Sequence, residues 1–381
     1  MTIRVLSVFG TRPEAIKMAP VVRALKAHPD VFESMVCVSA QHREMLDQVL
    51  GVFQLKADFD LDLMTPGQSP ADVVARLLER MPRLLREVQP DVLLVQGDTM
   101  TTFAAAFAAY LERVPTAHVE AGLRTGNKYH PYPEEMNRVL TTRLAELHFA
   151  PTVRAMETLL LEGIPQQDVL LTGNTVIDAL LATVRPNYRF TTPALEALDP
   201  NRRMVLVTTH RRESFGGPLE STCAAVRTLV ERFEDLEVVI PVHPNPQVKQ
   251  VVVRKLMDLQ RVHLIEPVDY VEFTNLMARS HIILTDSGGV QEEAPSLGKP
   301  VLVLREVTER PEGVEAGTAT IVGTDQEKIV RTASELLTSP AAYAKMANAV
   351  SPYGDGRASE RIADALRERF EARSTRQRRY A

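Results

Sequence analysis

The chain has 381 residues, more than the roughly 250–300 residues over which a single hydrophobic core keeps growing, so we expect two domains. Hydrophobic residues make up 45% of the sequence and charged residues 24%, as is typical of a globular protein. The formal net charge of −5 excludes a broad electrostatic attraction to nucleic acid, although it leaves room for a local anion pocket.

The apolar segments and the cysteines indicate a protein of an aqueous, reducing compartment. The longest uninterrupted apolar stretch, Phe103 to Leu111, is far shorter than the roughly 20 residues that a membrane helix requires. No signal peptide precedes the first predicted strand. Cys37 and Cys223 lie far apart in apolar contexts and form no Cys-x-x-Cys pair, which favours buried thiols over a disulfide or a zinc site. We therefore expect a cytoplasmic protein without membrane insertion.

Short runs of β-branched and aliphatic residues alternate with longer segments of helical period, which predicts parallel sheets with crossover helices. We expect a first series of strands at residues 4–8, 35–38, 92–96, 116–119, 147–150 and 168–171. We expect a second series at residues 204–208, 237–241, 263–265, 282–285, 301–304 and 320–322. The predicted fold class is α/β, with one Rossmann-like domain for each series.

A connector separates the two series of strands. Residues 185–203 have mixed polarity and contain Pro186, Pro193 and Pro200, which disfavours a regular element there. We expect the first domain over residues 1–172 and the second, which binds the nucleotide, over residues 173–359. A C-terminal helix at about residues 360–381 is expected to pack back on the first domain, with a solvated, arginine-rich end.

Two polar turns, each following a strongly apolar run, are the most informative features of the sequence. The first is GTRPEAIK at residues 10–17, and the second is DSGGVQEE at residues 286–293. A glycine-containing turn from a strand into a helix directs free backbone N–H groups at an anionic ligand, so we predict a phosphate contact at each turn. Arg12 and Lys17 add positive charge to the first turn, and Glu293 is placed to accept a hydrogen bond from a sugar hydroxyl. These features predict a nucleotide gripped by both domains.

Three carboxylates follow predicted strands or precede a predicted helix. Asp98 comes after the strand at 92–96, Glu120 comes directly after the strand at 116–119, and Glu134 follows two prolines. Ligands of open parallel sheets bind beyond the carboxyl ends of the strands, so we predict acid–base roles for these groups. The alternative for Asp98 is a helix N-cap, and for Glu134 and Glu135 it is the general preference for acids in a first helical turn.

Three histidines have two interpretations each. His118 and Glu120 are two apart on a strand and would share a face, but no further His or Cys lies nearby at a spacing typical of metal ligands. His210 precedes Arg211 at a strand end, where it either donates to phosphate or is buried. His243, which is flanked by prolines, is either a ligand contact or part of a turn.

Eight segments, in order and at consistent spacing, resemble the bacterial non-hydrolysing UDP-N-acetylglucosamine 2-epimerases. These segments are residues 9–20, 41–49, 97–102, 118–125, 133–138, 173–181, 209–215 and 284–300. A single motif such as Ser287-Gly288-Gly289 is a weak signal, whereas eight across nearly the whole chain are specific. The resemblance implies a fold of the glycosyltransferase-B type, with parallel sheets facing across a cleft. It also implies a homodimer and a role in cell-envelope polysaccharide biosynthesis.

The resemblance also implies roles for individual residues, and it implies neither a metal nor an added cofactor. The residues expected to bind the substrate are Arg12, Lys17, His210, Ser287, Gly288, Gly289, Glu293 and Arg310, with Val268 and Phe273 beside the uracil. The catalytic set is Asp98, Glu120, Glu134 and His210. A second UDP-GlcNAc is expected to bind as an activator near Gln41, Glu44, Arg211 and His243, with Glu44 standing where some relatives carry glutamine.

The implied reaction interconverts UDP-GlcNAc and UDP-ManNAc at C2. Direct deprotonation to an enolate is unavailable, because C2 carries the acetamido nitrogen and no adjacent carbonyl. We therefore hypothesise elimination of UDP to a 2-acetamidoglucal, followed by re-addition after protonation from the opposite face. Two alternatives stay open: a glycosyltransferase of the same architecture that uses a UDP-sugar donor, and a non-catalytic UDP-GlcNAc sensor. Three carboxylates near a diphosphate argue against the sensor.

Overall fold

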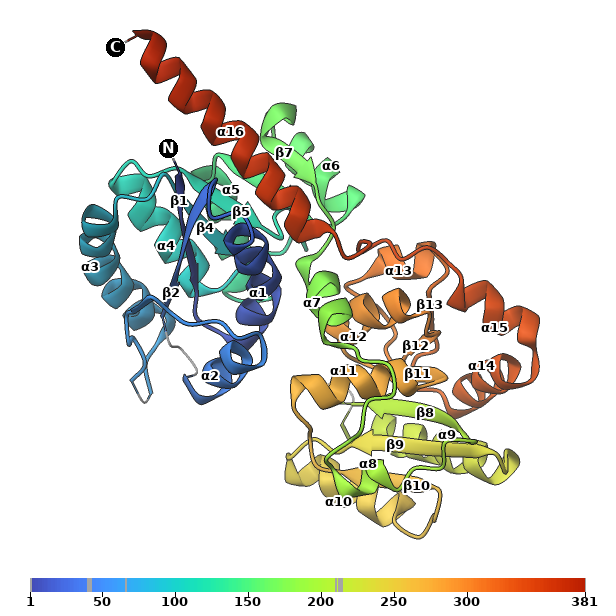
Figure 1. Ribbon diagram of the computed structural model, residues 1–381. Helices are drawn as coiled ribbons and strands as arrows, with labels where there is room; N and C mark the ends of the chain where they lie inside the picture. The colour runs from blue at the N-terminus through green and yellow to red at the C-terminus, as the bar shows by residue number, and fades with distance from the viewer. Residues whose placement is uncertain (1, 40–42, 66, 210, 212–214, 381) are drawn as a thin grey trace. The chain divides into compact units, whose positions relative to one another are not determined.

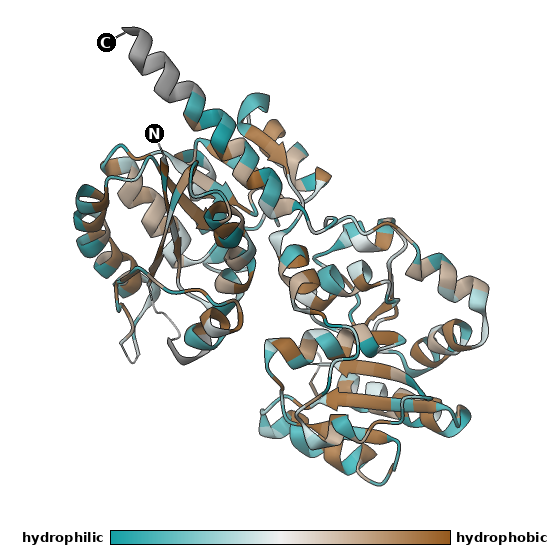
Figure 2. Ribbon diagram, viewed as in Figure 1, coloured by the Kyte–Doolittle hydropathy of each residue, from teal (hydrophilic) through white to brown (hydrophobic). Residues whose placement is uncertain are grey.

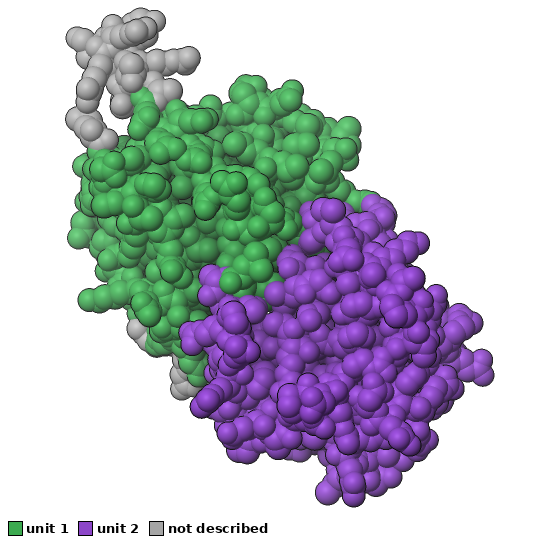
Figure 3. All heavy atoms as spheres, turned by 45° about the vertical axis from the view of Figure 1, so that its right-hand side comes forward, with its two compact units in different colours: residues 1–181, 353–381 green, residues 182–352 purple. Residues whose placement is uncertain are grey.

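The computed structural model describes residues 2–39, 43–65, 67–209, 211 and 215–380. Two compact units divide the chain: unit 1 comprises residues 1–181 and 353–381, and unit 2 comprises residues 182–352 (Figure 3). Each unit is an α/β domain with its own parallel sheet, as the sequence predicted. The first segment of unit 1 ends at residue 181, nine residues after the expected division at residue 172.

Unit 1 contains a seven-stranded parallel sheet with the order β3-β2-β1-β4-β5-β6-β7 (Figure 1). Its strands are β1 (Ile3–Phe9), β2 (Phe32–Val38), β3 (Phe59–Asp60), β4 (Val92–Gln96), β5 (Thr116–Val119), β6 (Leu147–Ala150) and β7 (Val169–Leu171). Six of the seven confirm predicted strands. The sequence missed β3 because it is two residues long and lies at the sheet edge, where no apolar run marks it.

The helices of unit 1 show the caps and apolar spacing that their sequences predict. They are α1 (Arg12–Lys26), α2 (Arg43–Val52), α3 (Pro70–Val88), α4 (Met100–Leu111), α5 (Glu134–Leu144), α6 (Val153–Leu161), α7 (Thr175–Thr183), which ends in unit 2, and α16 (Ala358–Tyr380). In α3, Ser69 and Asp72 form a capping box. Leu77 and Met81, one turn apart, are buried in the cluster that contains Leu93 of β4.

Unit 2 contains a six-stranded parallel sheet with the order β10-β9-β8-β11-β12-β13. Its strands, all predicted, are β8 (Arg203–Thr208), β9 (Leu236–Pro241), β10 (Val262–Ile265), β11 (Ile282–Thr285), β12 (Val301–Val303) and β13 (Ala319–Ile321). Its helices are α8 (Pro193–Glu196), α9 (Gly217–Arg232), α10 (Pro246–Leu256), α11 (Tyr270–Arg279), α12 (Gly288–Glu293), α13 (Pro311–Glu315), α14 (Gln326–Thr338) and α15 (Pro340–Ala347).

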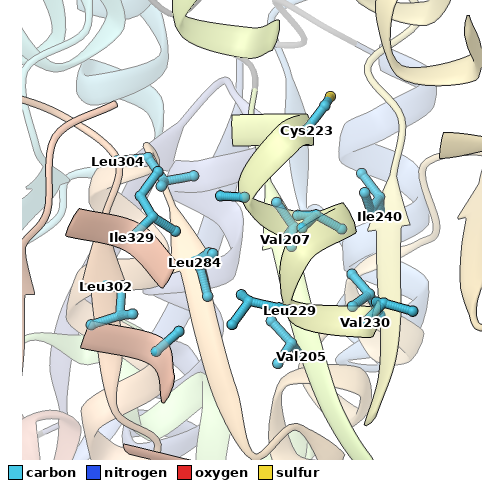
Figure 4. Packing of buried hydrophobic residues seen from close by; sticks show 14 of the residues in the cluster. Val205, Val207, Cys223, Leu229, Val230, Ile240, Leu284, Leu302, Leu304 and Ile329 are labelled. Atoms are coloured by element: carbon cyan, nitrogen blue, oxygen red, sulfur yellow. The ribbon is translucent and has the colours of Figure 1, made fainter. Parts of the chain in front are cut away.

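One core cluster of unit 2 lies between its sheet and the helices α9, α10 and α14. Figure 2 shows β8 and β9 as predominantly apolar strands, whereas the helices mix polar and apolar residues. Val207 of β8, Leu284 of β11 and Ile240 of β9 pack against Leu229 of α9 and Ile329 of α14 (Figure 4). Burial of such side chains stabilises the sheet by about 1.5–3 kcal/mol each. The rigid sheet thereby fixes the positions of the loops at its ends.

In each sheet the strand order reverses at one point, between β1 and β4 in unit 1 and between β8 and β11 in unit 2. Ligands of open parallel sheets bind in the crevice that such a reversal leaves beyond the carboxyl ends of the strands. These strands lead into Gly10, Gly97, Thr209 and Asp286, respectively. The polar turns noted in the sequence therefore lie at the reversal points.

The C-terminal helix α16 belongs to unit 1, where it contacts α1. Ile362 and Leu366 are buried one turn apart along it. Cys37 and Cys223 are both buried free thiols, as expected, and burial raises their pKa values to about 12 and about 11. Within the described residues, no helix combines the length and the apolarity needed to cross a membrane.

Candidate active site

The turn between β1 and α1 has backbone amides that are already bonded within the protein. Glu14 Oε2 accepts hydrogen bonds from the N–H groups of Gly10 at 3.0 Å and Thr11 at 2.7 Å. The Thr11 side chain in turn caps the N–H of Glu14, which completes a capping box. Glu14 therefore occupies two amides of this turn, and the predicted phosphate contact stays a prediction that would depend on the rest of the turn and on the side chains of Arg12 and Lys17. The Arg12 side chain is exposed, and Lys17 is half-buried one turn later.

Gly10 serves close packing in this turn. A β-carbon there would lie 1.9 Å from Ser39 Oγ and 2.9 Å from Thr101 Oγ1. Glu14 Oε1 accepts from the Thr99 hydroxyl at 2.7 Å, so this carboxylate also joins α1 to the start of α4. Burial raises the pKa of Glu14, and the hydrogen bonds that it accepts oppose that rise. The carboxylate of Glu14 thus holds the first turn by hydrogen bonds to the backbone of the turn and to the start of α4.

Asp98 lies in the loop between β4 and α4 and is held by α5. Its carboxylate accepts from the Arg138 guanidinium at 2.6 Å, and its carbonyl accepts from the side-chain amide of Asn137 at 2.9 Å. The N-cap alternative for Asp98 is wrong, because the Thr99 side chain caps α4 by accepting from the N–H of Thr102. The Asp98 side chain keeps 31% of its surface exposed. A positioned and accessible carboxylate is what acid–base chemistry requires.

Glu120 lies directly after β5 and is held by two donors. Lys17 Nζ lies 2.8 Å from Oε1 and 2.5 Å from Oε2, and the side-chain amide of Gln96 donates to Oε2. Glu120 is 9% exposed and has a φ of +64°. A non-glycine residue in this conformation costs about 1–3 kcal/mol and persists only where the surroundings hold it, often at active sites. Side chains from α1 and β4 thus both donate to the carboxylate that directly follows β5.

The two acids at the start of α5 have different surroundings. Glu135 is buried and accepts from the N–H groups of Thr125 and Gly126, both at 3.0 Å, so it fixes the loop before the helix. Glu134 is half-buried and makes no hydrogen bond or ion pair within the described residues. Glu135 therefore serves the structure, and Glu134 is the acid on α5 that is available for another molecule.

The three predicted carboxylates lie on neighbouring elements of unit 1. Gln96, which contacts Glu120, ends β4 two residues before Asp98. Arg138, which contacts Asp98, lies one turn after Glu134 on α5. Asp98 and Glu120 thus follow the paired strands β4 and β5, and Glu134 begins the helix that holds Asp98.

His118 is not arranged as a metal ligand. It is fully buried, its Nε2 hydrogen-bonds the carbonyl oxygen of Gly97 at 2.7 Å, and burial lowers its pKa to about 3. The carboxylate of Glu120, its suggested partner, is occupied by Lys17 and Gln96. Across the part of the chain that the structure describes, no three His, Cys, Asp or Glu side chains are grouped to hold a metal ion.

The turn between β11 and α12 differs from the first turn, because the structure shows no side chain that caps the start of the helix. Asp286 is fully buried, and its carboxylate accepts from the N–H of Arg211 at 3.0 Å. The N–H of Ser287 donates to the Thr285 hydroxyl at 2.9 Å, and α12 begins at Gly288 without a side-chain cap. The first amides of α12 thus have no capping side chain of their own.

Two guanidinium groups flank the start of α12. A β-carbon at Gly288 would lie 3.9 Å from a terminal nitrogen of Arg211 and 3.9 Å from one of Arg310. The buried Glu292 accepts from Arg310 Nε, and Glu309 lies 3.6 Å from Arg211. Positive charge next to a helix N-terminus favours an anion. This arrangement suits a phosphate.

The remaining predicted contacts of unit 2 lie near α11 and α12. Glu293 is 9% exposed, and its Oε1 lies 3.5 Å from the position that a β-carbon of Gly289 would take. Burial, and secondarily the charge of Glu293, raise the pKa of Tyr270 well above its ordinary value. Val268 and Phe273 are both half-buried, one just before α11 and the other in its first turn.

The residues expected at a second nucleotide site are only partly described. Gln41 and His210 lie outside the described residues, and Glu44 lies in α2 with its side chain outside them. His243 Nδ1 accepts from the N–H of Asn245 at 3.2 Å, so its ring organises the turn before α10. This contact leaves Nε2 as the nitrogen that carries the proton in the neutral ring.

Sequence reasoning did not single out four side chains that hold the site together. They are Gln96, Asn137, Arg138 and Glu292. A glutamine that ends an apolar strand was a usable signal for Gln96. No spacing relates Arg138 to Asp98, which lie 40 positions apart, or Glu292 to Arg310, which lie 18 apart, because these contacts exist only in the folded chain.

Comparisons with known proteins agree across the whole chain. The family model described as UDP-N-acetylglucosamine 2-epimerase matches residues 23–367. UDP-N-acetylglucosamine 2-epimerase of Bacillus subtilis is 54% identical, with 96% of this chain and 95% of the relative covered. The enzyme of that name from Escherichia coli K12 is 50% identical, with 96% and 98% covered. The resemblance inferred from the sequence motifs is therefore confirmed.

Solved structures give the same result. The UDP-GlcNAc 2-epimerase of Neisseria meningitidis, determined with UDP-GlcNAc bound, is 48% identical and superposes with a TM-score of 0.84, covering 96% of this chain and 99% of that one. An S. aureus protein determined with UDP is 45% identical, with a TM-score of 0.86 and 97% of both chains covered. A glycotransferase of kitacinnamycin, 13% identical with a TM-score of 0.66, shares the fold, which confirms the glycosyltransferase-B type.

Proposed function

The chain belongs to the UDP-N-acetylglucosamine 2-epimerase family and is an isomerase, and we propose that it reversibly converts UDP-GlcNAc into UDP-ManNAc by inverting C2. The observation that carries this proposal is that Asp98 and Glu120 follow the paired strands β4 and β5, each held by donor side chains, with Glu134 at the start of α5, the helix that holds Asp98. A sensor needs no such set of acids beside a diphosphate, because their charge opposes binding.

The chemistry proceeds by elimination and re-addition. UDP leaves C1 as a base removes the proton from C2, which gives a 2-acetamidoglucal. A proton then returns to C2 from the opposite face, and the retained UDP adds back to C1. The proton leaves C2 from one face of the sugar and returns from the other. We therefore assign the two proton transfers to more than one carboxylate. Acid–base assistance of this kind contributes about a hundredfold to ten-thousandfold in rate.

Within unit 1, the environments of the three acids suit separate tasks. Lys17 and Gln96 hold Glu120 from two sides, Arg138 holds Asp98, and Glu134 is uncommitted. We assign proton transfer at C2 to this set. Arg12, whose exposed side chain begins α1, and Lys17 supply positive charge for the departing diphosphate.

Within unit 2, we assign most of the binding of UDP to the start of α12. We propose that Arg310 and the turn at Ser287, Gly288 and Gly289 bind the diphosphate, with His210 as a further donor. Support comes from the two guanidinium groups that flank Gly288. Glu293 then binds a hydroxyl, and Val268 and Phe273 contact the uracil. Two relatives were determined with UDP-GlcNAc and with UDP bound, which supports a UDP-containing ligand for this chain.

We further propose that a second UDP-GlcNAc acts as an activator beside the substrate, at Gln41, Glu44, Arg211 and His243. One observation supports a position next to the substrate. Arg211 belongs to this set, and a terminal nitrogen of its guanidinium lies 3.9 Å from the β-carbon position of Gly288. In this proposal Arg211 would contact the substrate diphosphate as well as that of the activator.

A homodimer is the proposed assembly, formed through the outer face of α4 and α5. Phe103 and Phe107 stack one turn apart on α4, with ring centroids 6.2 Å apart, and Tyr110 continues this face. Met136 and Leu140 are exposed one turn apart on α5, which contacts α4. A second copy would cover this apolar face. Phe107→Glu should convert the dimer into a monomer in analytical ultracentrifugation, and an unchanged mass would reject this interface.

The location proposed is the cytoplasm, which the two buried free thiols support. The proposed activity is tested by incubating the purified chain with UDP-GlcNAc alone and identifying the products by NMR. The expected product is UDP-ManNAc at equilibrium with UDP-GlcNAc, without an added cofactor. Free ManNAc would indicate hydrolysis, and an unchanged substrate would indicate a sensor or a transferase that lacks its acceptor.

A further inference from the structure

The backbone on both sides of Asp98 is held by buried side chains. The carbonyl oxygen of Gly97 lies 2.7 Å from Nε2 of His118, and the carbonyl oxygen of Asp98 accepts from the Asn137 amide at 2.9 Å. His118 is 0% exposed and Asn137 is 4% exposed. The Gly97 carbonyl belongs to the peptide group that ends at the nitrogen of Asp98. The two bonds therefore fix the peptide planes before and after this residue.

The charge state and tautomer of His118 follow from its surroundings. Burial lowers the pKa of His118 to about 3, so the ring is neutral at physiological pH. A neutral imidazole has one N–H, and a carbonyl oxygen can only accept. The hydrogen is therefore on Nε2, which donates to Gly97. Within the described residues, Nδ1 has no hydrogen-bond partner.

Gly97 is the point at which this loop needs an external support. It has a φ of +72°, and a β-carbon there would meet nothing within 4 Å. Its own N–H donates to the carbonyl of Val119 at 3.0 Å, which fixes only the preceding side. Because glycine moves readily between backbone conformations, the peptide leading to Asp98 is free to rotate unless its carbonyl is held.

We propose that His118 is a positioning residue for the reaction, in that its hydrogen bond to Gly97 keeps the carboxylate of Asp98 aimed at the substrate. The Arg138 guanidinium, 2.6 Å from that carboxylate, can meet it only while the loop stays in place. This inference rests on the proposed function, in which Asp98 is one of the reacting carboxylates. His118 acts through Asp98 and does not touch the sugar.

The chain contains a matched control histidine. His148 of β6 is in register with His118 of β5, so both side chains project from the same face of the sheet. His148 is 1% exposed, its pKa is lowered to about 4 by burial, and its Nδ1 likewise has no partner within the described residues. Its hydrogen bond goes to the backbone of Ala145, at the end of α5 far from Glu134. The two histidines thus differ mainly in which carbonyl they hold.

The experiment compares His118→Gln, His118→Asn and His148→Asn by their kcat and KM for UDP-GlcNAc. The amide nitrogen of glutamine is as many bonds from Cα as Nε2 of histidine, whereas that of asparagine is at the Nδ1 position. We expect His118→Asn to lose about a hundredfold in kcat with little change in KM, as a misplacement of about 1 Å does. His118→Gln should recover most of that loss, and His148→Asn should keep kcat.

Wild-type kcat in His118→Asn, or an equal loss of kcat in His148→Asn, would overturn the inference. A second measurement needs no variant: ¹⁵N-histidine NMR of the wild-type chain should show His118 neutral with its proton on Nε2 between about pH 5 and pH 9. A proton on Nδ1 would also overturn it. Asp98→Asn separates the two proposals, because full activity in that variant rejects the role of Asp98. An inactive Asp98→Asn beside an unaffected His118→Asn rejects only the positioning role.

Discussion

The turns after β1 and β11 have the same sequence character and different structures. Both follow a buried strand, contain glycine and begin a helix. In the first turn, the carboxylate of Glu14 accepts hydrogen bonds from the N–H groups of Gly10 and Thr11. In the second, the amides of α12 have no side-chain cap, and two guanidinium groups flank Gly288. The same pattern thus gives a turn capped by an internal carboxylate in unit 1 and a turn without a side-chain cap, flanked by two guanidinium groups, in unit 2.

This difference supports separate proposed roles for the two units, with acid–base chemistry in unit 1 and diphosphate binding mainly in unit 2. The capped turn positions α1 so that Lys17 reaches Glu120, which makes unit 1 the source of acid–base groups. The turn without a side-chain cap makes unit 2 the main source of diphosphate binding. The sequence signal that separates the two is the capping box Thr11-x-x-Glu14, which has no counterpart after Ser287.

The largest effect is expected from Glu120→Gln, which tests the assignment of chemistry to unit 1. The variant keeps the shape of the side chain and removes its ability to take a proton. We expect kcat to fall at least about a hundredfold. The affinity for UDP, measured by isothermal titration calorimetry, should stay within about threefold of the wild-type value, because the proposed contacts to the diphosphate lie mainly in unit 2. A parallel loss of affinity would contradict the division.

The next effect is expected from Arg310→Met, which tests the assignment of binding to unit 2. Loss of a charged hydrogen-bond donor to phosphate costs about 1.5–3 kcal/mol, so KM for UDP-GlcNAc should rise roughly tenfold to a hundredfold. Arg254→Met, which removes an exposed arginine paired with Glu220 on the same unit, is the control and should leave KM unchanged. Equal behaviour of the two variants would reject a phosphate site at α12.

A pair of glycine substitutions tests the comparison directly. Gly10→Ala should destabilise the fold by about 1–3 kcal/mol, because its β-carbon would lie 1.9 Å from Ser39 Oγ. Gly288→Ala should leave the unfolding midpoint unchanged, since its neighbours are 3.9 Å away, and should weaken UDP binding. Gly51→Ala in α2, where nothing lies within 4 Å, is the control for both measurements. Equal effects of Gly10→Ala and Gly288→Ala on stability would remove the distinction between the turns.

The smallest effect concerns the pH dependence that Glu14 confers on stability. Because its pKa is raised by burial above the ordinary 4.5, the folded state binds more protons than the unfolded state once the pH exceeds that value. Stability must then fall as the pH rises through the raised pKa. Relative to Glu14→Gln, wild type should lose stability in urea unfolding as the pH is raised from 4.5. A constant or opposite difference would show that Glu14 does not titrate this way.

The sequence was sufficient for the architecture. Runs such as residues 92–96 and 282–285 are buried on both faces, so their apolar character marks them plainly as strands. It was insufficient for the two-residue β3, which is too short to carry a periodic signal. The structural role of Glu135 and the availability of Glu134 also became visible only in the fold, because a loop from Thr125 reaches the first of them.

The sequence could not decide between alternatives where a local rule had two outcomes. Asp98 and Thr99 are both favoured capping residues, and only the direction of the loop decides that Thr99 caps α4. The glycine turn after β1 was predicted to offer free amides, and only the structure shows that Glu14 accepts hydrogen bonds from two of them, those of Gly10 and Thr11. Contacts between distant residues, such as Arg138 with Asp98, follow from packing and have no local signature.

The most direct test of the central claim follows hydrogen at C2 when UDP-GlcNAc is incubated with the chain in D₂O. If Asp98, Glu120 and Glu134 exchange that hydrogen while UDP is held, NMR will show deuterium at C2 of UDP-ManNAc and of recovered UDP-GlcNAc. Glu120→Gln, with its UDP affinity intact, will then show neither. UDP-ManNAc that retains the original hydrogen at C2 would contradict the account.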